Sequence, residues 1–122
     1  MDGMKTQKDP PRQNILFVCT YNEIRSSTAE TVYAAEGLSV KSAGTYPWSP
    51  VPVSADLLSW ADLIFVMETG HKEILDTKYE EVLKNKQIIV LDIAGSYDYM
   101  EPSLVEIIKQ KVGQWIKSEG NQ

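Results

Sequence analysis

The sequence of 122 residues contains one cysteine, one histidine and no long apolar run. A single cysteine cannot form an internal disulfide, and no basic stretch leads into an apolar segment near Met1, so nothing indicates secretion. No apolar run approaches the roughly 20 residues that a membrane-spanning helix requires, so we expect no membrane contact. These absences together predict a cytoplasmic protein.

Positive charge is also scarce, with 12 basic against 17 acidic side chains and a net charge of −5. Such a balance opposes general affinity for nucleic acid, so we expect no nucleic-acid partner. No cluster of histidine, cysteine and carboxylate side chains has the spacing of metal ligands, so we expect neither a metal nor a cofactor. His71 lies in the polar stretch TGHKE, which favours a solvated surface position.

A hydrophobic content of 43% in a chain of this length fits one compact domain. Residues 1–13 are polar and interrupted by prolines, so we expect a flexible tail there. The single domain is then expected to span residues 14–122.

Apolar runs typical of strands alternate along the chain with helical patterns. We expect strands near residues 15–19, 38–44, 62–67 and 88–93, and helices near residues 25–36, 54–60, 70–84 and 102–117. Strands that are apolar on both faces and joined by helices predict an α/β fold. The expected architecture is a three-layer sandwich with a four-stranded parallel sheet, strand order 2-1-3-4, and helices on both faces. Trp60 and Trp115 are expected in the core.

The stretch VCTYNEIRSS places the only cysteine at the end of the first expected strand. A loop between a strand and a helix directs backbone NH groups toward one point, and the helix start adds partial positive charge, so an anion is favoured there. The same field favours the thiolate form of Cys19. Arg25 can grip two phosphate oxygens, while Asn22 and Ser26 can brace the loop. The alternative is a structural Cys19 that packs as a small hydrophobic residue.

Several blocks resemble the low-molecular-weight protein tyrosine phosphatases. The segment VCTYNEIRSSTAE resembles their phosphate-loop signature, KSAGT resembles their second strand, and ADLIFVMETGHKEIL resembles a later strand and helix. More narrowly, LDIAGSYDYMEPSLVEII is similar to a compact bacterial-type branch of predicted tyrosine phosphatases. The blocks follow the family's order over most of residues 14–117, although the chain is shorter than typical members between Gly44 and Ala61.

The resemblance implies that Cys19 is the nucleophile, Arg25 the phosphate clamp and Asn22 the loop brace. It also implies that the Ser26 hydroxyl donates to the thiolate. The phosphate would be bound by the loop residues Thr20, Tyr21, Asn22, Glu23, Ile24, Arg25 and Ser26. Trp48 and Tyr97 fall at positions that line the substrate pocket in the family, but Trp48 fits a cap over the core edge equally well.

The family's general-acid aspartate aligns with Gly95, which has no side chain. Asp92, Asp98 and Glu101 surround this gap, and we favour Asp98 because it lies in a loop between two tyrosines. Glu101 before Pro102 fits a charged helix start equally well.

The sequence therefore predicts a phosphate monoester hydrolase that acts on aryl phosphate or phosphotyrosine through a cysteinyl-phosphate intermediate. Its partner would be a phosphorylated protein or a small aryl phosphate. The alternative is a phosphate-binding or phosphotyrosine-binding module without efficient turnover, because the general acid is missing. Arsenate reduction is disfavoured because it needs further cysteines, and cysteine phosphocarriers of sugar transport do not generally present an arginine at this spacing.

Overall fold

The computed structural model describes residues 13–116. Within that range the strands β1 (Asn14–Cys19), β2 (Ser39–Gly44), β3 (Leu63–Val66) and β4 (Ile88–Val90) form one sheet. All pairs are parallel and the order is β2-β1-β3-β4, so the expected strand order is confirmed. The flexible tail expected at residues 1–13 lies outside the described residues, except for Gln13.

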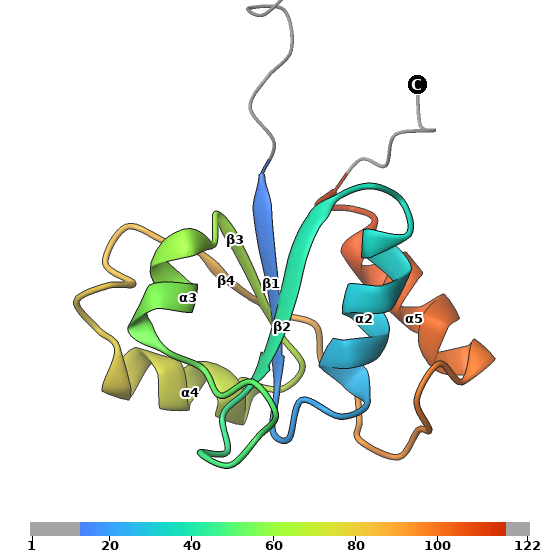
Figure 1. Ribbon diagram of the computed structural model, residues 1–122, viewed down its shortest axis with the longest axis horizontal. Coiled ribbons are helices and arrows are strands. Elements are labelled where there is room, and N and C mark those ends of the chain that lie inside the picture. Colours follow the sequence, from blue (N-terminus) through green and yellow to red (C-terminus); the bar gives the residue numbers. More distant parts are fainter. Residues whose placement is uncertain (1–12, 117–122) are drawn as a thin grey trace, which may run out of the picture.

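Helices cover both faces of the sheet, as Figure 1 shows. The helices α2 (Arg25–Ala34) and α5 (Pro102–Val112) lie on one face, and α3 (Ala55–Trp60) and α4 (Thr69–Lys78) on the other. The predicted three-layer α/β sandwich is therefore confirmed. No helix in the described part of the chain is long and apolar enough to cross a membrane.

The strand β1 contributes to two hydrophobic cores because successive side chains point to opposite faces of a sheet. Ile15 and Phe17 belong to a first core cluster together with residues of α2 and α5. Leu16 and Val18 belong to a second cluster with residues of α3 and α4. The sheet is thus buried on both sides, which explains why its strands are apolar without alternation.

Two expected features differ from the structure. The helix expected over residues 70–84 ends at Lys78, because Tyr79 leaves the helical conformation (φ −129°) and its hydroxyl donates to the Val53 carbonyl. Trp115 was expected in the core and this is wrong, since its side chain is 43% exposed. The helix α5 ends at Val112, so Trp115 no longer follows the helical register of the buried residues Leu104 and Ile108.

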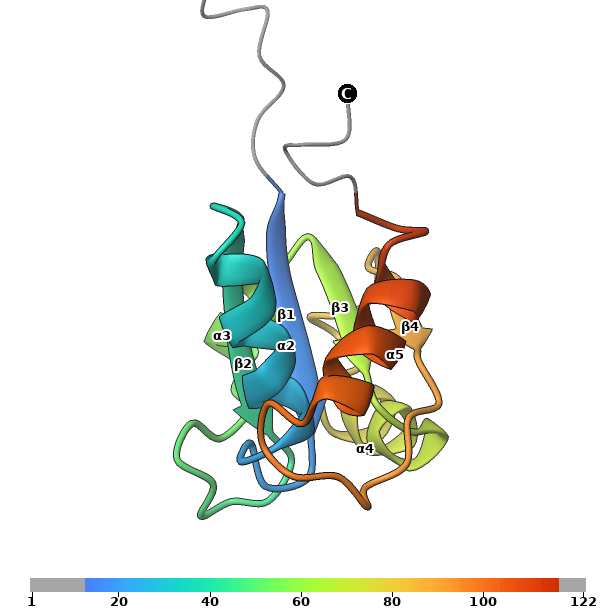
Figure 2. The same ribbon diagram turned by 90° about the vertical axis from the view of Figure 1, so that its right-hand side faces the viewer.

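The carboxyl ends of the strands lie at one end of the molecule, where the loops after β1, β2 and β4 gather (Figure 2). Gly44 lets the first two of these loops meet, because a Cβ there would lie 2.6 Å from the Thr20 carbonyl oxygen and 2.2 Å from Ser49 Oγ. The Thr45 NH donates to Cys19 O at 2.9 Å, and the Tyr46 NH donates to Thr20 O at 2.9 Å. This end of the sheet is where α/β folds bind ligands.

Candidate active site

The loop between β1 and α2, called here the Cys19–Ser26 loop, presents unpaired backbone donors. Asn22 adopts a left-handed conformation (φ 59°), which asparagine tolerates and which turns the chain sharply. Within residues 13–116, no protein group accepts a hydrogen bond from the NH groups of residues 21–24. The N-cap of α2, Ile24, also supplies no side-chain cap. Free NH groups at a helix start are suited to binding an anion.

Cys19 ends β1, is 3% exposed and belongs to the first core cluster, so its thiol lies at the edge where that core meets the loop. Its Sγ is 3.0 Å from Ser26 Oγ. Ser26 Oγ accepts from the Asn22 amide at 3.1 Å, and its single hydrogen has two acceptors, the sulfur at 3.0 Å and the more distant Ala43 carbonyl at 3.4 Å. A hydroxyl that donates to sulfur stabilises the thiolate, as the resemblance to the phosphatases implies for Ser26.

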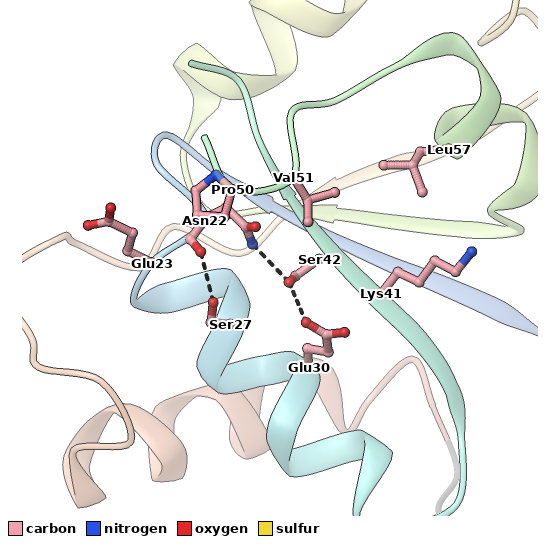
Figure 3. A pocket seen from close by; sticks show the side chains of 9 residues that line it. All are labelled: Asn22, Glu23, Ser27, Glu30, Lys41, Ser42, Pro50, Val51 and Leu57. Atoms are coloured by element: carbon pink, nitrogen blue, oxygen red, sulfur yellow. Dashed lines mark hydrogen bonds between the residues drawn. The ribbon is translucent and has the colours of Figure 1, made fainter. Parts of the chain in front are cut away.

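A chain of hydrogen bonds continues from Asn22 toward the edge of the sheet, as Figure 3 shows. The Asn22 amide donates to Ser42 Oγ at 2.8 Å, and Ser42 donates to Glu30 Oε1 at 2.5 Å. Ser27 Oγ donates to the Asn22 carbonyl at 2.9 Å. These contacts line a cavity of about 450 Å³, and Glu23 points away from them and is exposed. Two hydrogen bonds therefore fix the Asn22 side chain, and a third fixes its main-chain carbonyl.

Arg25 is the first residue of α2 and is only 9% exposed. Its Nη1 donates to Glu68 Oε2 at 2.5 Å and to the Ile93 carbonyl at 2.8 Å. Among the described residues, no group accepts from Nε or Nη2. One corner of the guanidinium is therefore anchored, and its Nε and Nη2 edge remains for two oxygens of a tetrahedral anion.

Glu68 and His71 form a capping box at the start of α4. The Glu68 NH donates to His71 Nδ1 at 3.1 Å, so we assign the ring proton to Nε2, which donates to Thr20 Oγ1 at 2.8 Å. The expectation that His71 lies on a solvated surface is wrong, since it is 5% exposed. The polar residues around His71 in the sequence led to that expectation. The imidazole ring is nevertheless buried and makes hydrogen bonds to two partners, Thr20 and the Glu68 NH.

The Arg25 charge and burial shift the pKa values of Glu68 and His71. The hydrogen bond from Arg25 is the main cause that lowers the pKa of Glu68 below its usual value. Burial is the main cause that lowers the pKa of His71, and the nearby Arg25 charge lowers it further. At neutral pH, Glu68 is therefore a carboxylate and His71 is neutral.

Position 95 lies at the guanidinium. A Cβ built on Gly95 would be 3.4 Å from Arg25 Cζ and from Arg25 Nη2. The residue that aligns with the family's aspartate thus stands where a side chain would meet Arg25, and it supplies no carboxylate.

The three carboxylates that sequence analysis considered near this gap differ in their surroundings. Asp92 and Asp98 are exposed. The carboxylate of Glu101 accepts from the Asp98 NH and from Ser103 Oγ, and these two bonds lower the pKa of Glu101. Glu101 therefore serves the start of α5, which is the second interpretation of the Glu101-Pro102 pair.

The two expected wall residues occupy different environments. Tyr97 is partly buried against the first core cluster. Trp48 is 79% exposed, so its alternative interpretation as a cap over the core edge is wrong. Its ring instead contacts Tyr46, with ring centroids 5.6 Å apart.

Sequence analysis did not find Glu68, the one carboxylate that bonds to Arg25 in the described part of the chain. A usable signal was present. The residues Glu68 to His71 follow directly on the apolar strand DLIFVM, at the carboxyl edge of the sheet, and have the spacing of a capping box.

Solved structures with the same fold are phosphatases. The tyrosine phosphatase Wzb from Escherichia coli K30 in complex with phosphate is 18% identical, with a TM-score of 0.69 over 86% of this chain and 96% of that chain. The YwlE arginine phosphatase from Geobacillus stearothermophilus is 22% identical, with a TM-score of 0.67 over 84% and 92%. A YwlE cysteine-to-serine mutant with a phosphorylated active site serine is 20% identical, with a TM-score of 0.66 over 89% and 99%.

No family model matches the sequence, and no curated protein matches it significantly. At 18% to 22% identity, these likenesses concern the fold. The chain has the fold of the low-molecular-weight protein tyrosine phosphatases.

Proposed function

We propose that this protein is a cysteine-dependent phosphatase that hydrolyses aryl phosphate monoesters, phosphotyrosine among them. The observation that carries the proposal is the juxtaposition of a nucleophile and an anion cradle. Cys19 Sγ lies 3.0 Å from Ser26 Oγ, at the start of a loop whose NH groups at residues 21–24 have no acceptor among residues 13–116. In the same range, Nε and Nη2 of Arg25 have no acceptor either. The fold shared with tyrosine and arginine phosphatases supports the same conclusion.

The reaction proceeds in two displacements. The Cys19 thiolate attacks phosphorus, an S–P bond forms, and the P–O bond to the leaving group breaks. The loop NH groups and Arg25 hold the phosphoryl oxygens while charge moves toward the leaving oxygen. Water then attacks the cysteinyl phosphate, the S–P bond breaks, and phosphate leaves with the thiolate restored.

The missing side chain at position 95 favours aryl over alkyl phosphates. An aryl oxygen leaves readily without a proton, whereas an alkyl oxygen depends on one. Glu68 does not supply this proton, because its lowered pKa keeps it ionised at neutral pH. Asp98, exposed in the loop that also carries Gly95, remains the proposed donor.

Turnover of p-nitrophenyl phosphate tests the proposal. We expect the wild type to release p-nitrophenol with saturation kinetics, and Cys19→Ser to show no turnover beyond a single release of p-nitrophenol per protein. Because a YwlE mutant of this kind carries a phosphorylated active site serine, mass spectrometry of Cys19→Ser after incubation with substrate is expected to show one added phosphoryl group on residue 19.

The matched control is Ser59→Ala, which changes an exposed serine of α3 and is expected to retain wild-type rates. If the wild type binds phosphate or vanadate but turns over no aryl phosphate, the proposal is contradicted in favour of the binding module.

A further inference from the structure

Three exposed aromatic side chains form a continuous array that begins within the Cys19–Ser26 loop. Tyr21 packs edge to face against Tyr46 with centroids 5.3 Å apart, and Tyr46 packs against Trp48 at 5.6 Å. Their exposed fractions are 55%, 43% and 79%. We call these three residues the aromatic ladder.

Hydrogen bonds attach the segment that carries Tyr46 to the Cys19–Ser26 loop. The Tyr46 NH donates to the Thr20 carbonyl at 2.9 Å, and Ser49 Oγ donates to the same carbonyl at 3.2 Å. The absence of a Cβ at Gly44 allows this close approach. These bonds fix the backbone of Tyr46 relative to Cys19, and the three rings that contact one another there remain exposed.

We propose that the aromatic ladder docks the protein segment that flanks the phosphorylated residue of the substrate, and that it selects basic side chains in that segment. This inference rests on the proposed phosphatase function. Tyr21 is two residues from Cys19, so a chain whose phosphate enters the loop passes over the ladder. The occupant is an accessible segment of a phosphoprotein with arginine or lysine close to the phosphorylated residue.

Two observations favour a basic segment. The faces of tyrosine and tryptophan rings attract guanidinium and ammonium groups. Glu23, exposed in the same loop as Tyr21, adds negative charge to that loop, and the net charge of −5 opposes an acidic segment. Glu23 and the net charge repel an acidic peptide, whereas both attract a basic peptide.

The test compares three synthetic phosphotyrosine peptides that differ only in their flanking residues, which are arginine, alanine or glutamate. For the wild type we expect kcat/KM to fall in that order, with about fivefold between arginine and alanine. In Trp48→Ala and Tyr46→Ala we expect the preference for arginine over alanine to shrink by about twofold or more, because only the attraction by Glu23 and the net charge remains.

Trp115→Ala is the matched control, because Trp115 is also an exposed tryptophan. It follows α5, and the carboxyl end of this helix lies away from the loop after β1 (Figure 2). We expect it to keep the wild-type preference and the wild-type rate with p-nitrophenyl phosphate.

Equal kcat/KM for the arginine and alanine peptides in the wild type would overturn the docking proposal alone. The docking proposal is also overturned if Trp48→Ala lowers kcat/KM for all three peptides and for p-nitrophenyl phosphate by one common factor. The ladder would then act on the phosphate pocket itself. Failure of the wild type to hydrolyse p-nitrophenyl phosphate would instead remove the proposed function, and the docking inference with it.

Discussion

The Cys19–Ser26 loop has two flanks that are built in opposite ways. On one flank, Arg25 and Thr20 are held by the buried or ionic partners Glu68 and His71 through hydrogen bonds of 2.5 and 2.8 Å. On the other, Tyr21 meets an array of exposed rings. Under the proposed function, the first flank orients the groups that bind any phosphate monoester, and the second offers a surface that only a larger substrate reaches. We therefore assign the first flank to the phosphoryl-transfer reaction and the second flank to substrate selection.

The largest expected effect is on the anchored flank. Arg25→Ala removes the guanidinium edge that we assign to the phosphoryl oxygens, and we expect kcat for p-nitrophenyl phosphate to fall by about 10²- to 10³-fold. Steady-state kinetics measure this fall, with circular dichroism to verify the fold. A kcat within a few-fold of the wild type would remove Arg25 from the mechanism.

A second change tests the proton donor. If Asp98 protonates the leaving oxygen, Asp98→Asn is expected to slow hydrolysis of an alkyl phosphate by about 10²-fold and of p-nitrophenyl phosphate by much less. The comparison uses kcat/KM for the two substrates. The control is Asp92→Asn, which changes another exposed aspartate in the same segment between β4 and α5. Equal rates for Asp98→Asn and wild type on both substrates would dismiss this assignment.

The ion pair on the anchored flank gives a smaller effect. Glu68→Gln keeps an acceptor for Arg25 but removes the charge, so the guanidinium is held less firmly. We expect kcat/KM for p-nitrophenyl phosphate to fall by about tenfold. Glu73→Gln, an exposed residue of the same helix, serves as control. A rise in phosphate affinity would contradict this account, because it would mean that Glu68 competes with the substrate for Arg25.

The smallest effect concerns stability and pH. The pKa of His71 is lowered in the folded state from its ordinary value of 6.5, so the unfolded chain binds the proton more readily. The contribution of neutral His71 to the free energy of unfolding is therefore complete above pH 6.5. It is lost as the pH falls through the folded-state pKa.

We therefore expect the free energy of unfolding of the wild type to fall between pH 7 and pH 5, and His71 to contribute to this fall. In His71→Gln this part of the slope is expected to disappear, as measured by urea unfolding at several pH values. An unchanged slope would indicate that His71 does not titrate across this range.

The fold was predictable because it depends on long patterns. The continuous apolar strands around Phe17 and Phe65 imply a sheet buried on both faces, and a parallel sheet then follows from the intervening helices. Local endings were less predictable. The end of α4 depends on a tertiary hydrogen bond from Tyr79 to Val53, which no local pattern encodes.

The candidate site was predictable where it is contiguous in sequence. Cys19, Asn22, Arg25 and Ser26 lie in one short stretch of the sequence, and hydrogen bonds join Cys19, Asn22 and Ser26. Glu68 comes from a distant segment and reaches Arg25 only through the packing of β1 beside β3. A polar local sequence also concealed the burial of His71, because burial here depends on a partner 51 residues away.

The central claim is that the Cys19–Ser26 loop binds a tetrahedral oxyanion directly over the cysteine sulfur. A crystal structure with vanadate tests this most directly. We predict vanadium at bonding distance from Cys19 Sγ, with its oxygens bound by the NH groups of residues 21–24 and by Nε and Nη2 of Arg25. Vanadate bound elsewhere, with the loop empty at saturating concentration, would contradict the claim.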